Sequence, residues 1–125
     1  MKLQQPTVNL IVLRAQYPVD LAKIYEALGC RFVTERHGGG PEHLSADLGG
    51  ITLEIYPRAS AQSTSGLRIG FIVSDLEAVI AGMVEKGAGI VRNPEATPWG
   101  YRAVLEDTEG HRIEVTAKSL GQAGC

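Results

Sequence analysis

The chain has 125 residues, of which 44% are hydrophobic and 21% are charged. This length and composition predict a single domain over residues 1–125 with a buried core, and they argue against a disordered chain. The formal charge is −2, whereas proteins that bind nucleic acid or anionic membranes usually carry an excess of basic residues. We therefore expect neither nucleic acid nor a membrane among its partners.

Cysteine use and the first residues bear on the compartment. Two cysteines, Cys30 and Cys125, suggest neither a disulfide framework nor a cysteine-based zinc site. The first residues lack the apolar run of a signal peptide, and no stretch approaches the ~20 apolar residues of a membrane span. We expect a soluble, cytoplasmic protein.

The first half of the chain predicts a strand, a helix and three short strands. An apolar run predicts a strand at residues 8–13, and the next apolar residues have the spacing of one helical face at residues 20–28. These residues are Leu21, Ile24, Tyr25 and Leu28. Asp20 is the expected N-cap of the helix and Gly29 its stop. The short strands are expected at residues 32–35, 43–48 and 51–56, with a glycine turn at residues 38–40.

The second half predicts the same order of elements. After a small, polar linker at residues 57–66, an apolar run predicts a strand at residues 67–73. A second apolar face predicts a helix at residues 75–86, with Ser74 and Glu77 as a capping box and Gly87 as the stop. Short strands are expected at residues 90–92, 101–106 and 111–116.

An internal repeat relates the two halves. Asp47 and Asp107, Gly50 and Gly110, and Glu54 and Glu114 are each 60 residues apart. The apolar first strands and the Asp-Leu pairs that follow them recur at an offset of 55, so the loop lengths differ between the halves. The ordered series favours duplication of one βαβββ unit, with module one at about residues 7–58 and module two at about residues 66–117.

In this order and spacing the chain resembles the vicinal oxygen chelate superfamily of glyoxalases, bleomycin-resistance proteins, fosfomycin-resistance enzymes and extradiol dioxygenases. The small bleomycin-resistance-like members are the nearest in type. The resemblance spans about residues 7–117 and rests on Leu13-Arg14, Asp20-Leu21, Ile24-Tyr25, Leu28-Gly29, Leu53-Glu54-Ile55, Ser74-Asp75-Leu76, Lys86-Gly87-Ala88, Pro98-Trp99-Gly100 and the run from Asp107 to Glu114. It implies an α+β fold of two tandem βαβββ modules that form a concave, barrel-like sheet, and a homodimer that completes two clefts.

In metal-dependent members of this superfamily, ligands come from the first and last strand of each module. The last-strand positions are matched here by Glu54 and Glu114 and the first-strand positions by Leu10 and Arg68. Leucine has no donor atom and arginine repels a divalent cation. We therefore expect the usual metal site to be lost and no cofactor to be required.

The two glutamates allow two readings. Strand alternation places each opposite its aliphatic neighbours, so both could lie on a solvated sheet face, as strand glutamates usually do. The repeat and the resemblance favour instead a shared place in the ligand cleft, where Arg68 would neutralise one or both. We expect an Arg–Glu network there.

Other candidates are weaker. Trp99, in a Pro-Trp-Gly turn, could line the cleft or simply pack, and Tyr56 and Tyr101 could extend an aromatic wall, although packing is the usual role. His37 and His43 flank the glycine turn at a spacing that is not typical of metal sites, and we expect surface histidines.

A few remaining polar residues have bland readings. His111 is expected to point toward the helices or solvent. Arg14 and Arg102 could bind an anion, but isolated arginines are more often solvent-exposed surface residues. The hydroxyl residues of the linker, Thr64 among them, show no accompanying His–Asp pattern that would indicate a nucleophile.

These features favour a metal-independent protein that binds and sequesters a small molecule, with the ligand held by Glu54, Tyr56, Arg68, Trp99, Tyr101 and Glu114. The alternative is a lyase, isomerase or dioxygenase that binds a divalent metal through Glu54 and Glu114. A third reading is a subunit or regulatory domain whose cleft is vestigial. Fold-level resemblance alone cannot name the ligand.

Overall fold

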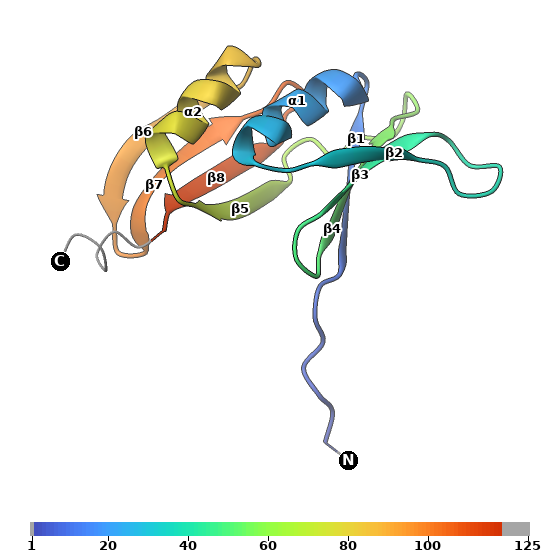
Figure 1. Cartoon of the computed structure of the whole chain (residues 1–125), viewed down its shortest axis with the longest axis horizontal. Coiled ribbons are helices and arrows are strands. Elements are labelled where there is room, and N and C mark those ends of the chain that lie inside the picture. Colours follow the sequence, from blue (N-terminus) through green and yellow to red (C-terminus); the bar gives the residue numbers. More distant parts are fainter. Residues whose placement is uncertain (1, 119–125) are drawn as a thin grey trace.

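Two βαβββ modules follow one another in the computed structural model, which describes residues 2–118 (Figure 1). The first consists of β1 (Leu10–Ala15), α1 (Pro18–Leu28), β2 (Phe32–Glu35), β3 (His43–Asp47) and β4 (Thr52–Pro57). The second consists of β5 (Arg68–Val73), α2 (Leu76–Glu85), β6 (Gly89–Thr97), β7 (Gly100–Glu106) and β8 (Arg112–Ala117). The predicted fold class is confirmed.

Each module forms one four-stranded mixed sheet, and the two sheets have the same topology. The strand orders are β1-β4-β3-β2 and β5-β8-β7-β6. The first and last strand of each module pair in parallel, and the other pairs are antiparallel. This shared order is the structural form of the 60-residue repeat, because Glu54 and Glu114 occupy matching places in β4 and β8.

One continuous apolar core joins the two modules. The helices lie side by side and contact each other (Figure 1), and α1 also contacts β1, β3 and β4 of the first sheet whereas α2 contacts β8 of the second. All four residues of the predicted apolar stripe on α1 pack into this core, and Leu21, Ile24 and Tyr25 are fully buried. The Tyr25 ring meets Phe71 of β5 edge to face, with ring centroids 6.3 Å apart. The first helix therefore packs against residues of both modules.

The helix ends differ in detail from the sequence expectations. Helix α1 begins at Pro18, whose ring pre-sets the helical φ, and the N-cap is Tyr17 without a side-chain bond, so Asp20 is not the cap. Helix α2 is capped by Asp75, which accepts the Ala78 N–H at 3.1 Å, and not by Ser74. Within the described chain, neither helix has the length and apolar character that a membrane crossing requires.

Strand β6 is much longer than expected. Two register shifts interrupt its pairing with β7, one between Ile90 and Arg92 and the other between Arg92 and Glu95. Pro94 lies within the second, where a missing N–H removes no ladder bond, and β6 is an edge strand. These irregularities obscure the alternating pattern, which is why the sequence indicated a strand of three residues.

Candidate functional site

One face of the second sheet carries charged side chains from three neighbouring strands. Ile113 and Val115 of β8 are fully buried in the core, so alternation along the strand turns Glu114 to the opposite face. Arg68 and Arg102 come from β5 and β7, the strands on either side of β8. The sheet therefore brings two guanidinium groups to one carboxylate.

Both oxygens of Glu114 are taken. Its Oε1 accepts from Nε and Nη2 of Arg68 at 2.9 and 2.7 Å, and its Oε2 accepts from Nη1 of Arg102 at 2.7 Å. These are the lengths of charge-assisted hydrogen bonds. The Arg68 side chain is 51% exposed and that of Arg102 26%, so water screens the Arg68 contact more strongly. The expected pairing of Arg68 with a strand glutamate is present at Glu114, and Glu54 has other partners.

A cavity of about 380 Å³ opens beside this ion-pair network. Its charged and aromatic lining consists of Arg68, Arg92, Glu95, Trp99 and Arg102. The Trp99 side chain is 74% exposed, and the Arg102 guanidinium lies over its ring, 5.2 Å from the centroid. Three cations and one exposed aromatic face thus surround one hollow. Sequence reasoning set Arg102 aside as a surface residue and did not consider Arg92 or Glu95.

The turn that carries Trp99 is held by Thr97. The Thr97 hydroxyl donates to the Gly100 carbonyl at 2.7 Å and accepts the Trp99 N–H at 3.1 Å. Gly100 has a φ of 123°, which side chains with a Cβ rarely adopt. The indole is therefore presented at the cavity by a turn with its own hydrogen bonds.

The first-strand positions of the resembled metal enzymes do not fit a metal here. Leu10 and Arg68 occupy equivalent places, at the first paired position of β1 and β5. The residues directly beside the two strand glutamates are Val12 and Gly70, which also lack side-chain donors. Because Glu114 is already shared by two guanidinium groups, a divalent cation at this place would meet two fixed positive charges.

Glu54 belongs to a different group, on the first sheet. Its Oε2 lies 3.5 Å from Nε2 of His43, and that nitrogen is 3.6 Å from Oε1 of Glu35. His37 Nε2 lies 3.4 Å from the same Glu35 oxygen. His37 is exposed as expected, but His43 is only 2% exposed, so its expected place on the surface is wrong. The hairpin register pairs His43 with Glu35 and turns both toward Glu54.

The two candidate tyrosines lie apart from the cavity. Tyr56 stacks on His43 with ring centroids 4.1 Å apart, and the Arg14 guanidinium lies 5.0 Å from its ring. Tyr101 alternates with Arg102 along β7, so it faces the other side of the sheet. The structure therefore does not bring either tyrosine together with Trp99.

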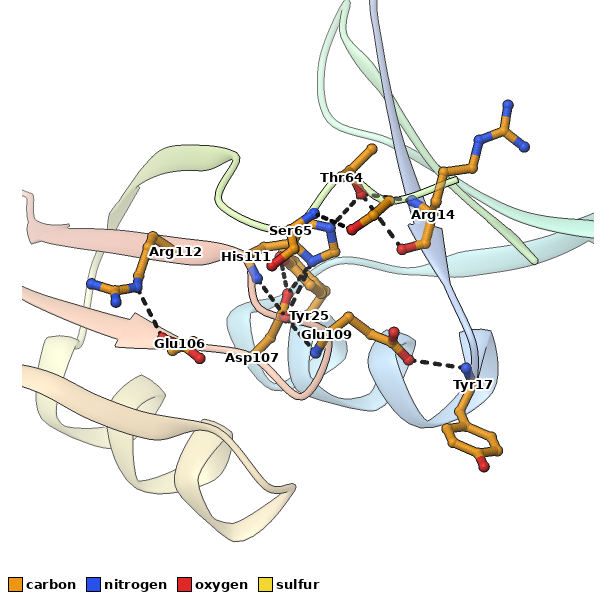
Figure 2. Close-up of polar contacts among 11 residues, drawn as sticks. Arg14, Tyr17, Tyr25, Thr64, Ser65, Glu106, Asp107, Glu109, His111 and Arg112 are labelled. Atoms are coloured by element: carbon orange, nitrogen blue, oxygen red, sulfur yellow. Dashed lines mark hydrogen bonds and ion pairs between the residues drawn. The ribbon is translucent and has the colours of Figure 1, made fainter. Parts of the chain in front are cut away.

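A buried polar network ties the linker to the β7–β8 turn (Figure 2). His111 is fully buried, its Nδ1 donates to the Asp107 carboxylate at 2.9 Å, and its Nε2 lies 2.6 Å from the Thr64 hydroxyl. Tyr25 donates to Oδ2 of Asp107 at 2.7 Å. Of the two orientations expected for His111, toward the helices or toward solvent, the structure shows the first, since the buried ring meets the carboxylate that Tyr25 of α1 also contacts. Thr64 does have a His–Asp partner that its sequence neighbours do not reveal.

Electrostatics keep this network in one charge state. Burial would raise the pKa of Asp107, but hydrogen bonds from His111 and Tyr25, the charge interaction with His111 and the Glu109 N–H together lower it below its ordinary value. Burial, followed by the Asp107 charge, raises the pKa of Tyr25 far above its ordinary value. The network therefore holds an anionic carboxylate and a neutral phenol.

The order Asp107, His111, Thr64 has the hydrogen-bond pattern of a catalytic triad, but its surroundings are structural. The Thr64 oxygen accepts the Arg14 N–H at 2.9 Å, and the hydroxyl lies 3.5 Å from the Arg14 carbonyl. The polar cavity of about 380 Å³ nearby is lined by neighbours such as Ser63 and Ser65 and not by Thr64. The hydroxyl thus fastens the linker to β1 through both backbone groups of Arg14.

Of the two cysteines, Cys30 is a free, buried thiol. Burial, and then the charge of Glu26, raises its pKa to about 11. At neutral pH it is a small apolar side chain with little thiolate character. Cys125 lies outside the described residues.

Comparison with known proteins places the fold in a family. Residues 7–115 match the model of the Glyoxalase/Bleomycin resistance protein/Dioxygenase superfamily, and no curated protein matches the chain. TnmS3, an antibiotic binding protein from Streptomyces sp. CB03234, has a similar structure with 20% identity and a TM-score of 0.74, covering 94% of this chain and 100% of its own.

Two further solved structures are similar. A glyoxalase/bleomycin resistance protein/dioxygenase family enzyme from Burkholderia phytofirmans PsJN has 19% identity and a TM-score of 0.70, with 87% of this chain and 96% of its own covered. TioX from Micromonospora sp. ML1 has 21% identity and a TM-score of 0.67, with 90% and 98% covered. At these identities the likeness shows the fold.

Proposed function

The chain belongs to the glyoxalase/bleomycin resistance protein/dioxygenase superfamily, and from this premise we propose that it binds and sequesters a small molecule in the cavity beside Glu114. The observation that carries the proposal is the exposed Trp99 ring next to Arg102, in a hollow of about 380 Å³. This volume lies at the lower end of the range for small-molecule sites.

The lining favours a flat ligand with an acidic group. An exposed indole offers a face for stacking, and a guanidinium already lies over it. Arg68, Arg92 and Arg102 supply three positive charges. Two negative charges oppose them, from Glu95 beside Arg92 and from Glu114 beside the other two arginines, so one positive charge is left in excess. Because Glu114 holds Arg68 and Arg102 in place, their remaining N–H groups are oriented before a ligand arrives.

A larger hollow, of about 460 Å³, lies on the first sheet. Its lining of Arg31, Glu35 and Asp47, together with Val33, Ser45 and Thr52, has no aromatic ring and more acidic than basic side chains. It lacks the stacking face that a flat ligand needs. The smaller cavity is therefore the better ligand site in spite of its volume.

The chemistry of the cavity supports binding without a metal. The alternative, a lyase, isomerase or dioxygenase with Glu54 and Glu114 as ligands, requires Glu114 to give up two guanidinium partners. The similarity to an antibiotic binding protein of known structure agrees with sequestration as a use of this fold. The similarity to a family enzyme keeps the alternative as the one to test against.

A homodimer belongs to the same proposal. Apolar side chains remain exposed on the sheet faces away from the helices, with Leu10 at 49%, Val33 at 58% and Ile72 at 75% exposure. A C₂ partner would cover them and close the cavities, as the family resemblance implies. Light scattering at a chain concentration of tens of micromolar, roughly the range of weak association, tests the assembly, and a monomer contradicts it.

Trp99 is the sole tryptophan of the sequence, so its fluorescence reports the cavity directly. We expect a panel of aromatic carboxylates to quench it with dissociation constants below about 1 mM, and the matching neutral amides to bind at least tenfold more weakly. Arg102→Ala should weaken binding about tenfold or more, whereas Arg31→Ala, at an exposed arginine directly before β2, should leave it unchanged. Equal binding by both variants would overturn the site assignment.

A further inference from the structure

Four side chains with metal-binding atoms lie together near the turn between β2 and β3 of the first sheet. Glu35, His37, His43 and Glu54 each offer one such atom, and these atoms lie within 4.8 Å of one another. They come from β2, the turn after it, β3 and β4, because the turn at Gly38 to Gly40 folds β3 back onto β2. None of them lines the cavity beside Glu114.

The contacts of His43 direct its Nε2 atom toward the two carboxylates. Its Nδ1 lies 3.2 Å from the Pro41 carbonyl, which can only accept, so Nδ1 carries a proton. Tyr56 stacks on the ring, with an interplanar angle of 10°. Nε2 is left facing Glu35 and Glu54, and it is a buried side-chain polar atom without a hydrogen-bond partner in the described chain.

Such a nitrogen needs a hydrogen-bond donor or a positive charge between it and the carboxylates. In a neutral ring Nε2 presents a lone pair to two carboxylate oxygens, which is repulsive, and a buried polar atom without a partner is costly. A proton or a metal ion would each resolve the repulsion. A proton would draw the oxygens to the ~2.8 Å of a charge-assisted bond. Three of the six separations among the four ligand atoms are 3.4 to 3.6 Å, close to the ~3.3 Å between ligand atoms around a tetrahedral zinc with bonds of about 2.0–2.1 Å, and all six lie within 4.8 Å.

We propose that Glu35, His37, His43 and Glu54 bind a divalent transition-metal ion, with Zn²⁺ the cation that this donor set suits best. Imidazole nitrogens and carboxylate oxygens both bind Zn²⁺, and four such ligands complete a tetrahedral sphere. The Pro41 carbonyl serves as the outer partner that fixes the tautomer of a metal-bound histidine. Four protein ligands close the coordination sphere, so the ion fastens the β2–β3 turn to the sheet and leaves no position for substrate.

This site differs from the metal positions that the family resemblance implies. Those lie on the first and last strand of both modules, whereas here three of the four ligands lie on or beside β2 and β3 of one module. Only Glu54 is common to the two. The ion can enter from solvent past His37 and Glu35, whose side chains are 69% and 36% exposed. The proposal is independent of ligand binding beside Trp99.

The test uses full-length protein without a histidine tag, freed of metal by a chelator and dialysed. Titration with Zn²⁺ against a chromophoric chelator should give one site per chain, and Zn²⁺ should raise the melting temperature. Co²⁺ should give the intense visible bands of a tetrahedral site. His37→Ala and Glu35→Gln, both at accessible positions, should each weaken Zn²⁺ binding about tenfold or more. Glu42→Gln, an exposed carboxylate on the same turn, is the matched control and should bind as the parent does.

Three results would overturn the proposal. They are no Zn²⁺ bound at equimolar, micromolar concentration, octahedral Co²⁺ bands, or equal losses in the two ligand variants and the Glu42→Gln control. Circular dichroism checks that each variant is folded, so a failure to fold cannot be mistaken for a lost ligand. Quenching of Trp99 fluorescence by aromatic acids should not depend on Zn²⁺, which separates the failure of this proposal from the failure of the proposed function.

Discussion

The Tyr25 hydroxyl donates a 2.7 Å hydrogen bond to the buried Asp107 carboxylate, and so links the first helix to the turn between β7 and β8, 82 residues away. The two modules are thus joined by a charge-assisted bond as well as by apolar packing. The ion-pair network on the second sheet lies on the opposite face from this contact.

Removal of that hydroxyl should be costly. Tyr25→Phe keeps the ring in the core but takes one donor from a buried carboxylate, and we expect a loss of about 1.5–3 kcal/mol in the free energy of unfolding. Urea denaturation measures it. Tyr17→Phe removes a hydroxyl from an exposed ring and should change stability by less than about 0.5 kcal/mol. Equal small effects would mean that Asp107 does not depend on Tyr25.

Acid should weaken the protein through Asp107. Its folded pKa lies below the ordinary value, so the unfolded chain binds this proton more readily. The stabilisation is complete above the unfolded pKa of about 4 and is lost as the pH falls from there through the lowered folded pKa. The unfolding free energy measured between pH 6 and about pH 2, the range that brackets this change, should fall less steeply in Asp107→Asn than in the parent. Parallel curves would contradict this.

Alkali should act through Tyr25 in the opposite direction. Its pKa is raised in the folded state, so the unfolded chain releases the phenolic proton first. The folded state should lose stability as the pH rises above about 10. Tyr25→Phe should remove this part of the alkaline decline, and Tyr17→Phe should not. Ultraviolet absorbance of the phenolate, followed with unfolding, separates the two residues.

The arginines of the second sheet should differ in their contributions to stability. Arg68→Ala removes a half-exposed partner of Glu114, and we expect a cost below about 1 kcal/mol. Arg102→Ala should cost more, because Arg102 is less exposed and also covers the Trp99 ring. Thermal unfolding of the two variants checks the order, and a larger loss in Arg68→Ala would reverse our view of which arginine holds Glu114.

Gly110 should not accept a side chain. It has a φ of 90°, and a Cβ there would overlap the Ser65 side chain. The neighbouring Gly66 N–H donates to the Gly110 carbonyl at 2.9 Å, so the linker cannot easily move away. Gly110→Ala should cost about 1–2 kcal/mol or more. Gly39→Ala, at a glycine with open space around it and no positive φ, is the control and should be close to neutral. Chemical denaturation compares them.

Local pattern was enough to predict the architecture. The 60-residue spacing of Glu54 and Glu114 survives as matching places in β4 and β8, and the stripe of Leu21, Ile24 and Tyr25 is fully buried. The stripe follows from the short period of a helix, and the 60-residue offset follows from repetition of one unit along the chain. Helix caps were less predictable, because more than one residue near each helix start could serve as the N-cap. Asp20 was expected where Tyr17 is the cap, and Ser74 where Asp75 is the cap.

The site residues depend on register, which sequence alone leaves open. His43 is buried because the hairpin pairs it with Glu35 and Tyr56 stacks on it, and neither contact leaves a local signal. His43 and Ser45 are two residues apart on β3 and so share one face of the strand, and Ser45 pairs with Glu54 of β4. This two-residue spacing is the signal that could have placed His43 beside Glu54. The contact of Thr64 with His111 spans 47 residues and follows from the path of the linker.

Strand β6 is an edge strand of the second sheet, and its irregular pairing affects whether two copies of the chain can pair edge to edge. A regular edge of nine residues would offer a template for a strand from another molecule. Pro94 interrupts the row of donors, the two register shifts twist the edge, and Arg92 and Glu95 place charges along it. The same strand that shapes one wall of the cavity beside Glu114 therefore also disfavours edge-to-edge aggregation.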